Sequence, residues 1–185
     1  FEHTPNGRLL VFDPITQKTT TLLSGLYFAN GVALSSDESF VLVNETLMYR
    51  IQKYWLKGDK AGTSEIFIEN LPGFPDNVSS NEEGIFWVAL FNPRNNFVEM
   101  SSNKPFLRKI VFRLPELLQP QPINHSFVLG LNENGKVVHN LQYQANEAYS
   151  PITSVKQYND ILYFGSLTHA AVSYTHLRAH ETFAN

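Results

Sequence analysis

Three short stretches of the chain, FANGV, FPDNV and PITSV, place a polar side chain two residues before a valine. The polar residues are Asn30, Asp76 and Thr153, and Asn77 directly follows Asp76. Carboxylate and amide oxygens are ligands that Ca²⁺ prefers, and this ion takes about 6 to 8 of them. The spacing leaves two interpretations open. One is a calcium site, and the other is the ordinary turn chemistry of Asn and Asp before a strand.

These side chains can meet only if the three stretches occupy equivalent places in a repeated unit. In each copy, strand-like residues follow the valine at eight and ten positions: Phe40 and Leu42, Phe86 and Val88, and Tyr163 and Gly165. Each copy therefore predicts a strand, a polar turn and a second strand, and a further hairpin lies between copies. The unit is four strands long, and its first period, from Val32 to Val78, is 46 residues.

A repeat of this size predicts an all-β chain whose four-stranded antiparallel sheets are blades of a β-propeller. We expect a partial propeller over residues 1–171, with about three blades in an open arc. The first strand of each blade lines the central channel of a propeller. Asn30, Asp76 and Thr153 are therefore expected to converge at the channel mouth.

An insertion at about 91–125 lengthens the second period, which runs 77 residues from Val78 to Val155. Apolar residues at helical spacing predict a helix over 104–118 within it. Such a helix either covers one end of the propeller, closes over a substrate as a lid, or contacts a membrane surface. His125 belongs to this insertion and is a candidate lid residue, with a solvated surface histidine as the alternative.

Composition narrows the classes of function. Of 185 residues, 14 are Lys or Arg and 17 are Asp or Glu, so there is no basic excess for nucleic acid. The chain has no cysteine, which excludes disulfides, thiolate metal ligands and cysteine nucleophiles. No apolar run reaches the roughly 20 residues of a membrane span. The first residue is Phe1, so a preceding anchor, and with it the compartment, stays open.

The last residues are predicted to have a different origin from the rest. Residues 172–182 read VSYTHLRAHET, which is similar to the translation of a common sequencing adapter, and Ala171 fits the same reading frame. We therefore expect residues 172–185 to be a non-native tail that makes few contacts. On this interpretation the natural protein continues past residue 171, and His176 and His180 are not catalytic candidates.

Longer stretches carry a family resemblance over residues 6–167. They are GRLLVFDP, GLYFANGVALSSDESFVLVNET, YRIQKYWLKGDKAGTSEIF, NLPGFPDNV, FWVAL and ILYFGSL. The chain resembles the strictosidine synthase-like family, which includes adipocyte plasma membrane-associated protein. The resemblance implies a six-bladed propeller related to gluconolactonases and paraoxonases, which hold a catalytic Ca²⁺ at the channel mouth. It implies that Asn30, Asp76 and Asn77 are calcium ligands, with further ligands upstream of Phe1.

The resemblance also implies a reaction. A Ca²⁺ at the channel mouth acts as a Lewis acid, so we expect hydrolysis of small esters or lactones, with Asp76 as nucleophile or general base. The alkaloid-forming plant enzymes carry a catalytic Glu where this chain has Thr153, which disfavours a condensing lyase. Thr153 is then expected to face the substrate. The alternative is a non-catalytic propeller with a structural calcium, which binds a protein or lipid partner.

Overall fold

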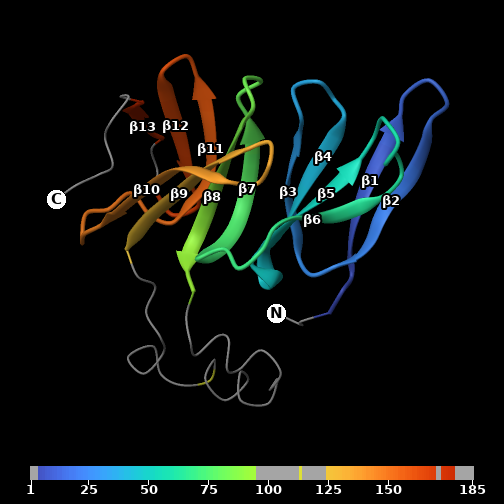
Figure 1. Cartoon of the computed structure of the whole chain (residues 1–185). Coiled ribbons are helices and arrows are strands. Elements are labelled where there is room, and N and C mark those ends of the chain that lie inside the picture. The colour runs from blue at the N-terminus through green and yellow to red at the C-terminus, as the bar shows by residue number, and fades with distance from the viewer. Residues whose placement is uncertain (1–3, 95–112, 114–123, 170–171, 178–185) are drawn as a thin grey trace.

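The computed structural model describes residues 4–94, 113, 124–169 and 172–177, whose strands form four antiparallel sheets (Figure 1). The first sheet pairs β1 (Gly7–Asp13) with β2 (Lys18–Leu26). The second contains β3 (Ala29–Leu34), β4 (Phe40–Glu45), β5 (Arg50–Trp55) and β6 (Ser64–Ile68), with a short 3₁₀ helix, η1 (Thr46–Met48), after β4. The third contains β7 (Gly73–Ser80), β8 (Ile85–Pro93), β9 (His125–Asn132) and β10 (Val137–Gln144). The fourth contains β11 (Ile152–Tyr158), β12 (Ile161–Ser166) and β13 (Ser173–His176).

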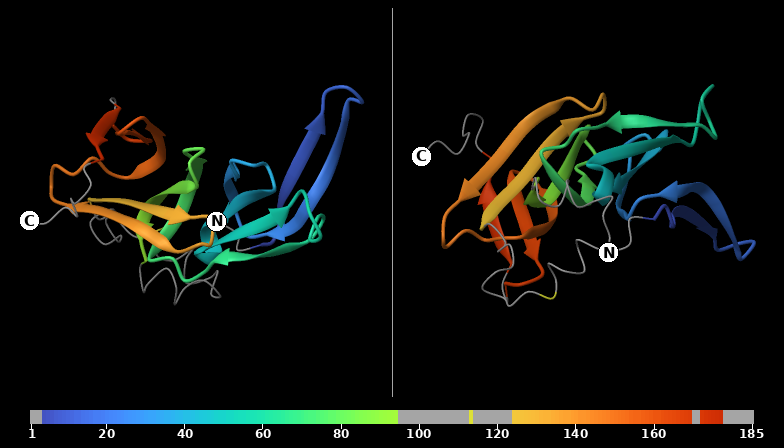
Figure 2. Two further views of the ribbon diagram at one scale, coloured as in Figure 1. Left: turned by 45° about the horizontal axis from the view of Figure 1, so that its top comes forward. Right: turned by 90° about the horizontal axis from the view of Figure 1, so that it is seen from below.

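The sheets confirm the prediction of an all-β chain with four-stranded, blade-like units. In each four-stranded sheet, strands that are neighbours in sequence are hydrogen-bonded neighbours in space, in the orders β3-β4-β5-β6 and β7-β8-β9-β10. The sheets stand beside one another in chain order (Figure 2). The first strands of the last three sheets are β3, β7 and β11, of which β7 contacts both of the others; they are called the inner strands below.

The second strand of each full sheet is buried on both faces, which explains its unbroken hydrophobic run. In β8, Phe86 and Val88 pack in the core shared with the second sheet. Their neighbours Trp87 and Ala89 pack in the core shared with the fourth sheet. Successive side chains of a strand point to opposite faces, so one strand supplies both interfaces.

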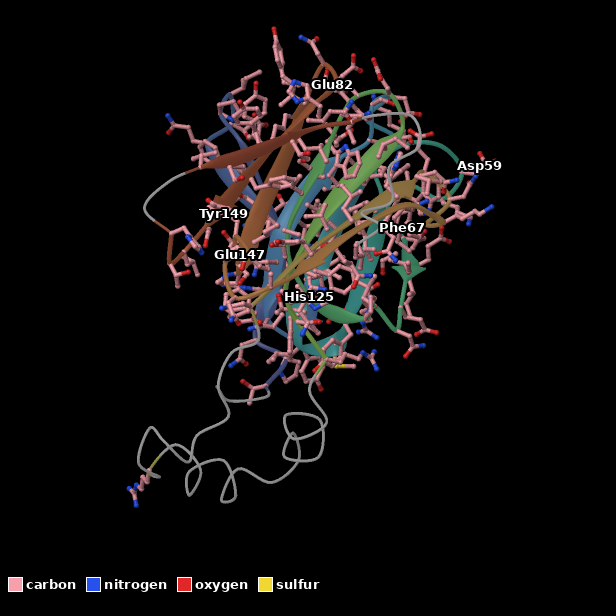
Figure 3. The ribbon with its side chains drawn as sticks, turned by 90° about the vertical axis from the view of Figure 1, so that its left-hand side faces the viewer. Asp59, Phe67, Glu82, His125, Glu147 and Tyr149 are labelled. Carbon is pink, nitrogen blue, oxygen red and sulfur yellow. The ribbon has the colours of Figure 1, made fainter. Side chains whose placement is uncertain are left out.

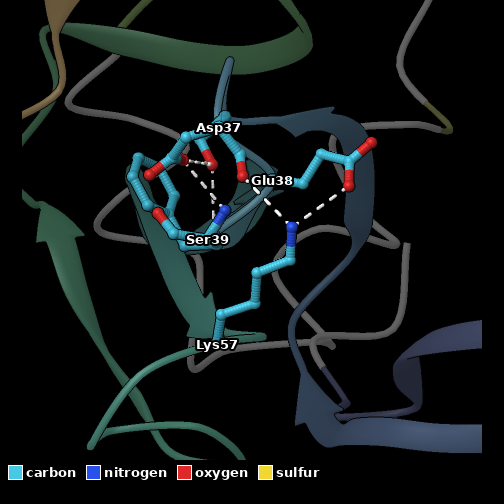
Figure 4. A network of polar contacts seen from close by, with 6 residues as sticks. Asp37, Glu38, Ser39 and Lys57 are labelled. Carbon is cyan, nitrogen blue, oxygen red and sulfur yellow. Dashed lines mark hydrogen bonds and ion pairs between the residues drawn. The ribbon is translucent and has the colours of Figure 1, made fainter.

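Short polar side chains shape the turn between β3 and β4. The Asp37 carboxylate accepts hydrogen bonds from the Ser39 backbone N–H and the Ser35 hydroxyl, each at 2.9 Å (Figure 4). The hydrogen bonds from Ser39, followed by the one from Ser35, lower the pKa of Asp37 to about 2. Lys57 reaches the same turn, with its Nζ 3.2 Å from Glu38 Oε2. The turn therefore has its own polar support where the chain enters β4.

A buried lysine joins the outer strands of the second and third sheets. Lys53 on β5 is 7% exposed, and its Nζ lies 4.2 Å from the ring centroid of Phe40 and 4.8 Å from that of Phe67. The same ammonium donates to the carbonyl of Glu133, in the turn between β9 and β10, at 3.2 Å. Burial lowers the pKa of Lys53. Cation–π attraction and this hydrogen bond offset part of the loss of hydration.

The predicted insertion is shorter than expected at both ends. β8 continues to Pro93, and β9 begins at His125, so residues 91 and 125 belong to strands. His125 is therefore the first residue of β9, at the edge of the predicted insertion. The predicted helix over 104–118 lies outside the described residues, apart from Arg113. Where the structure describes the chain, no helix has the length and apolar character to cross a membrane.

Part of the predicted tail is structured. Ser173–His176 forms β13 and pairs with β12, with Tyr174 opposite Tyr163. The expectation that residues 172–185 make few contacts is wrong for this segment. The edge of β12 presents backbone N–H and C=O groups, and a short strand of alternating side chains can pair with them.

A buried carboxylate links the strands of the second sheet to the chain before β3. Glu45, the last residue of β4, is fully buried, and its Oε2 accepts hydrogen bonds from Arg50 Nε and from Gln52 Nε2. Its Oε1 accepts from the backbone N–H of Tyr27 at 3.0 Å. Burial is the largest single influence and raises the pKa of Glu45. The hydrogen bonds from Arg50, Tyr27 and Gln52 outweigh it together, and the pKa lies below its ordinary value.

This carboxylate should make stability depend on pH. Because the folded-state pKa of Glu45 is lowered from 4.5, its contribution is present above that pH and is lost as the pH falls through the folded-state value. Glu45→Gln should lower the free energy of unfolding by about 1–3 kcal/mol at neutral pH, because it removes the charge that Arg50 and Gln52 stabilise. Its stability should then fall less steeply than that of the wild type below about pH 4.5.

Urea denaturation at a series of pH values measures both effects. Glu38→Gln is the control, since Glu38 pairs with Lys57 on the surface, and it should change stability by less than about 0.5 kcal/mol. A Glu45→Gln variant that differs from the wild type by the same amount at all pH values would contradict the prediction.

Candidate functional site

A β-bulge occurs at the same place in each inner strand. The pairing register shifts between Ala29 and Val32 of β3, between Pro75 and Val78 of β7, and between Ile152 and Ser154 of β11. A bulge leaves its extra residue out of the ladder and re-aims side chains, and bulges are common beside active sites. The candidate residues Asn30, Asp76 and Thr153 each lie in one of these bulges.

Asn30 and Asp76 meet across β3 and β7. Asn30 Nδ2 donates hydrogen bonds to Asp76 Oδ1 at 2.7 Å and to Thr46 Oγ1 at 3.3 Å. Asp76 is half-buried, and this burial raises its pKa, while the hydrogen bond from Asn30 acts in the opposite direction. In the described part of the chain, none of the ion pairs includes Asp76. A carboxylate in this setting is stabilised in its charged form by a nearby cation.

Asn77 and Thr153 meet across β7 and β11, but through a backbone group. Asn77 Nδ2 donates to the backbone carbonyl of Thr153 at 2.8 Å. The hydroxyl of Thr153 donates within its own sheet, to the carbonyl of Gly165 at 3.2 Å. The structure therefore brings the backbone of Thr153 to the Asn77 side chain, while the Thr153 hydroxyl is engaged with β12.

The contact between β3 and β7 is close enough to require glycine. A Cβ atom on Gly31 would lie 2.5 Å from the backbone N of Val78, 2.6 Å from the Cα of Asn77 and 2.7 Å from the carbonyl oxygen of Asp76. Backbone atoms cannot move aside as a flexible side chain can. Gly31 therefore permits the approach that places Asn30 against Asp76.

The repeat pattern did not indicate two further residues that hold Asp76. Asn44, at 0% exposure on β4, donates from Nδ2 to the backbone carbonyl of Asp76 at 2.8 Å. Thr46, the first residue of η1, donates from its hydroxyl to the carbonyl of Pro75 at 2.7 Å. The signal that could have found them is the polar run Asn-Glu-Thr directly after the apolar Val-Leu-Val of a doubly buried strand.

The side chains present fit a hard cation. Asp76 supplies a carboxylate, and the amide NH₂ groups of Asn30 and Asn77 are both donated to protein oxygens, which leaves their Oδ1 atoms as acceptors. The Oδ1 of Asn44 is a buried acceptor with no hydrogen-bond partner. Within the residues described, no three His, Cys, Asp or Glu side chains cluster as metal ligands. A cation here would therefore depend on amide and carbonyl oxygens beside a single carboxylate, a set that suits Ca²⁺ better than a transition metal.

His125 lies on the same end of the third sheet as Asp76 but in a different setting. β7 and β8 are antiparallel, with Gly73 opposite Pro93, so the chain leaves β8 and enters β9 at the end that carries Asp76. The ring of His125 stacks on Phe127 at 5.2 Å between centroids, and its Nε2 lies 3.1 Å from Gln142 Oε1. Figure 3 shows His125 near one end of the molecule, while Glu82 lies at the other. Its role beside the substrate stays a prediction.

Comparisons with known proteins identify the family. A profile described as strictosidine synthase matches residues 1–59. Strictosidine synthase-like 10 of Arabidopsis thaliana is 41% identical over 169 residues, which are 87% of this chain and 44% of that protein. The chain belongs to the strictosidine synthase-like family. Adipocyte plasma membrane-associated protein of Bos taurus, another member, is 36% identical over 171 residues, which are 89% of this chain and 42% of that protein. The chain thus spans less than half the length of these relatives.

Solved structures show the same fold at lower identity. A gluconolactonase of Xanthomonas campestris matches with a TM-score of 0.55 and 13% identity, over 85% of this chain and 40% of that one. Regucalcin of Agrobacterium tumefaciens, described as a calcium-binding protein, matches with a TM-score of 0.54 and 15% identity, over 91% of this chain and 47% of that one. This strictosidine synthase-like chain is therefore structurally similar to gluconolactonase and regucalcin propellers, as its sequence predicts.

The close approach of β3 and β7 can be tested by adding one methyl group. Gly31→Ala should lower the free energy of unfolding by about 1–3 kcal/mol, because its Cβ would overlap backbone atoms of β7 that have no room to shift. Gly58→Ala is a control for the loss of glycine, since nothing lies within 4 Å of its added Cβ, although its φ of +79° adds strain. Thermal unfolding measures both variants. A Gly31→Ala protein as stable as the wild type would show that the two strands are not held at this distance.

Proposed function

We propose that this chain is part of a six-bladed propeller that acts as a calcium-dependent hydrolase on small esters or lactones. The observation that carries the proposal is the hydrogen bond at 2.7 Å from Asn30 Nδ2 to Asp76 Oδ1, which joins the bulges of two adjacent inner strands, with Asn77 next to Asp76 in the chain. These three side chains offer one carboxylate and two amide oxygens at the same end of the sheets. They are the residues that would hold Ca²⁺, together with ligands from parts of the full-length protein outside this chain.

A bound Ca²⁺ would supply Lewis-acid polarisation of the substrate carbonyl and stabilise the oxyanion that develops there. Asp76 would act as a nucleophile toward the carbonyl carbon or take a proton from water. Asn30 donates to Asp76 Oδ1, which orients the carboxylate and leaves Oδ2 for the reaction. Thr153 has no carboxylate, and its hydroxyl donates to Gly165, so a condensation that needs a carboxylate base at this position is disfavoured.

A second function has its own observation in favour. The hydrogen bond between Asn30 and Asp76 joins two sheets, so a cation bound by these side chains would also strengthen the contact between blades. A calcium ion with this purely structural role would support a propeller that binds a protein or lipid partner. Metal-dependent turnover separates the two functions, because both predict metal binding and only one predicts a reaction.

The test uses the full-length protein that contains this chain. Hydrolysis of a panel of aryl esters and lactones should be detected with Ca²⁺ and lost with a chelator. Asp76→Ala should reduce kcat/KM by about 100-fold or more, because it removes both a metal ligand and the reacting carboxylate. Asp59→Ala, which removes a carboxylate from the exposed turn between β5 and β6, is the matched control and should leave the rate unchanged.

The melting temperature decides among the outcomes. Calcium should raise it by several degrees in the wild type and not in Asp76→Ala, since a ligand that binds only the folded state stabilises it. A calcium-dependent rise with no turnover would favour the structural alternative. If calcium produced neither turnover nor a rise in melting temperature, the calcium site itself would be overturned.

A further inference from the structure

Thr46 makes hydrogen bonds to both strands that carry the candidate calcium ligands. It is 8% exposed, and its backbone N–H donates to the carbonyl of Phe28 at 3.1 Å, beside the start of β3. Its hydroxyl donates to the carbonyl of Pro75, in the bulge of β7, at 2.7 Å. A hydroxyl has one proton to give, so the remaining lone pairs of Thr46 Oγ1 can only accept. They accept from Asn30 Nδ2 at 3.3 Å.

The side-chain amide of Asn30 therefore faces two acceptors. One of its NH₂ protons goes to Thr46 Oγ1 and the other to Asp76 Oδ1. Rotating the amide by half a turn would place Asn30 Oδ1 against a carboxylate oxygen and a hydroxyl oxygen whose proton is already given away. Oxygen facing oxygen is repulsive, so the two acceptors determine which way the amide points. The carbonyl of Asn30 is turned away from both.

We infer that Thr46 is a positioning residue, which orients the Asn30 amide so that its Oδ1 is presented as a ligand and which holds the bulge that carries Asp76. The part of this inference that concerns calcium rests on the proposed function. The orientation of Asn30 does not, because it follows from hydrogen bonds within the chain.

Three substitutions separate a positioning role of the Thr46 hydroxyl from a role of Thr46 in packing alone. Thr46→Val keeps the size and shape of the side chain, but it cannot donate to Pro75 or accept from Asn30. Thr46→Ser keeps the hydroxyl and loses only a methyl group. Thr63→Val is a matched control, because the Thr63 hydroxyl also donates to a carbonyl at 2.7 Å, that of Lys60, in the exposed turn between β5 and β6.

The first experiment follows the Asn30 side-chain amide by ¹⁵N NMR in the calcium-free, full-length protein, with Asn30→Asp to assign its signals. In the wild type, both NH₂ protons should exchange slowly with water. Thr46→Val should lose protection of one proton only, the one that faced Thr46, and Thr46→Ser and Thr63→Val should keep both. Unchanged protection in Thr46→Val would overturn the inference. If that variant does not fold, rapid exchange of both protons in the wild type would overturn it as well.

The second experiment measures calcium affinity by titration calorimetry. Thr46→Val should weaken binding by about 10- to 100-fold, as expected for a group that orients a metal ligand, while Thr46→Ser should stay within about threefold. Wild-type affinity in a folded Thr46→Val protein would overturn the positioning role. A wild type that binds no calcium would overturn the proposed function instead, and the NMR result would still decide how Asn30 is oriented.

Discussion

The bulge in each inner strand is the constraint on which the candidate site depends. A bulge adds a residue that the partner strand cannot match, so backbone groups there need hydrogen bonds from elsewhere. In β7 these come from the preceding sheet, because Asn44 and Thr46 donate to the carbonyls of Asp76 and Pro75. The strand that carries Asp76 thus takes its shape from the neighbouring blade. The site is a property of the contact between blades, and a single blade would not form it.

The two neighbours of β7 are held in different ways. On the β3 side, Gly31 lies directly against the backbone of β7. On the β11 side, side chains of β7 connect the strands, with Asn77 and Ser79 donating to the carbonyls of Thr153 and Val155. The residues of β7 that face β11 alternate along the strand, as the period of a strand requires. The contact with β3 fixes the hydrogen bond between Asn30 and Asp76, and the contact with β11 uses the NH₂ of Asn77 and leaves its oxygen as an acceptor.

Repetition made most of the fold and part of the site predictable. The spacing from one valine to the next indicated which residues share a place in each blade, and equivalent places in adjacent inner strands lie close together. Repetition could not indicate Asn44 or Thr46, since their partners are backbone groups of a different blade, and only the polar run that follows the apolar residues of β4 marks them. The strand position of His125 was missed for another reason. β9 opens with two polar residues, His125 and Ser126, and its hydrophobic run begins only at Phe127.

Two carboxylates, Glu45 in the second sheet and Asp76 in the third, differ in how far the fold compensates for their burial. Glu45 is fully buried, yet its pKa is lowered, because Arg50, Gln52 and the Tyr27 backbone donate to it. Asp76 is only half-buried, yet its pKa is raised, because Asn30 alone opposes the loss of hydration. A carboxylate that the fold leaves undercompensated is a local conflict, and such conflicts concentrate at functional sites. The fold pairs Glu45 with a basic side chain, Arg50, whereas none of the ion pairs of the described residues includes Asp76. The described residues around Asp76 supply amide groups instead, which leaves its negative charge available to a cation or a substrate.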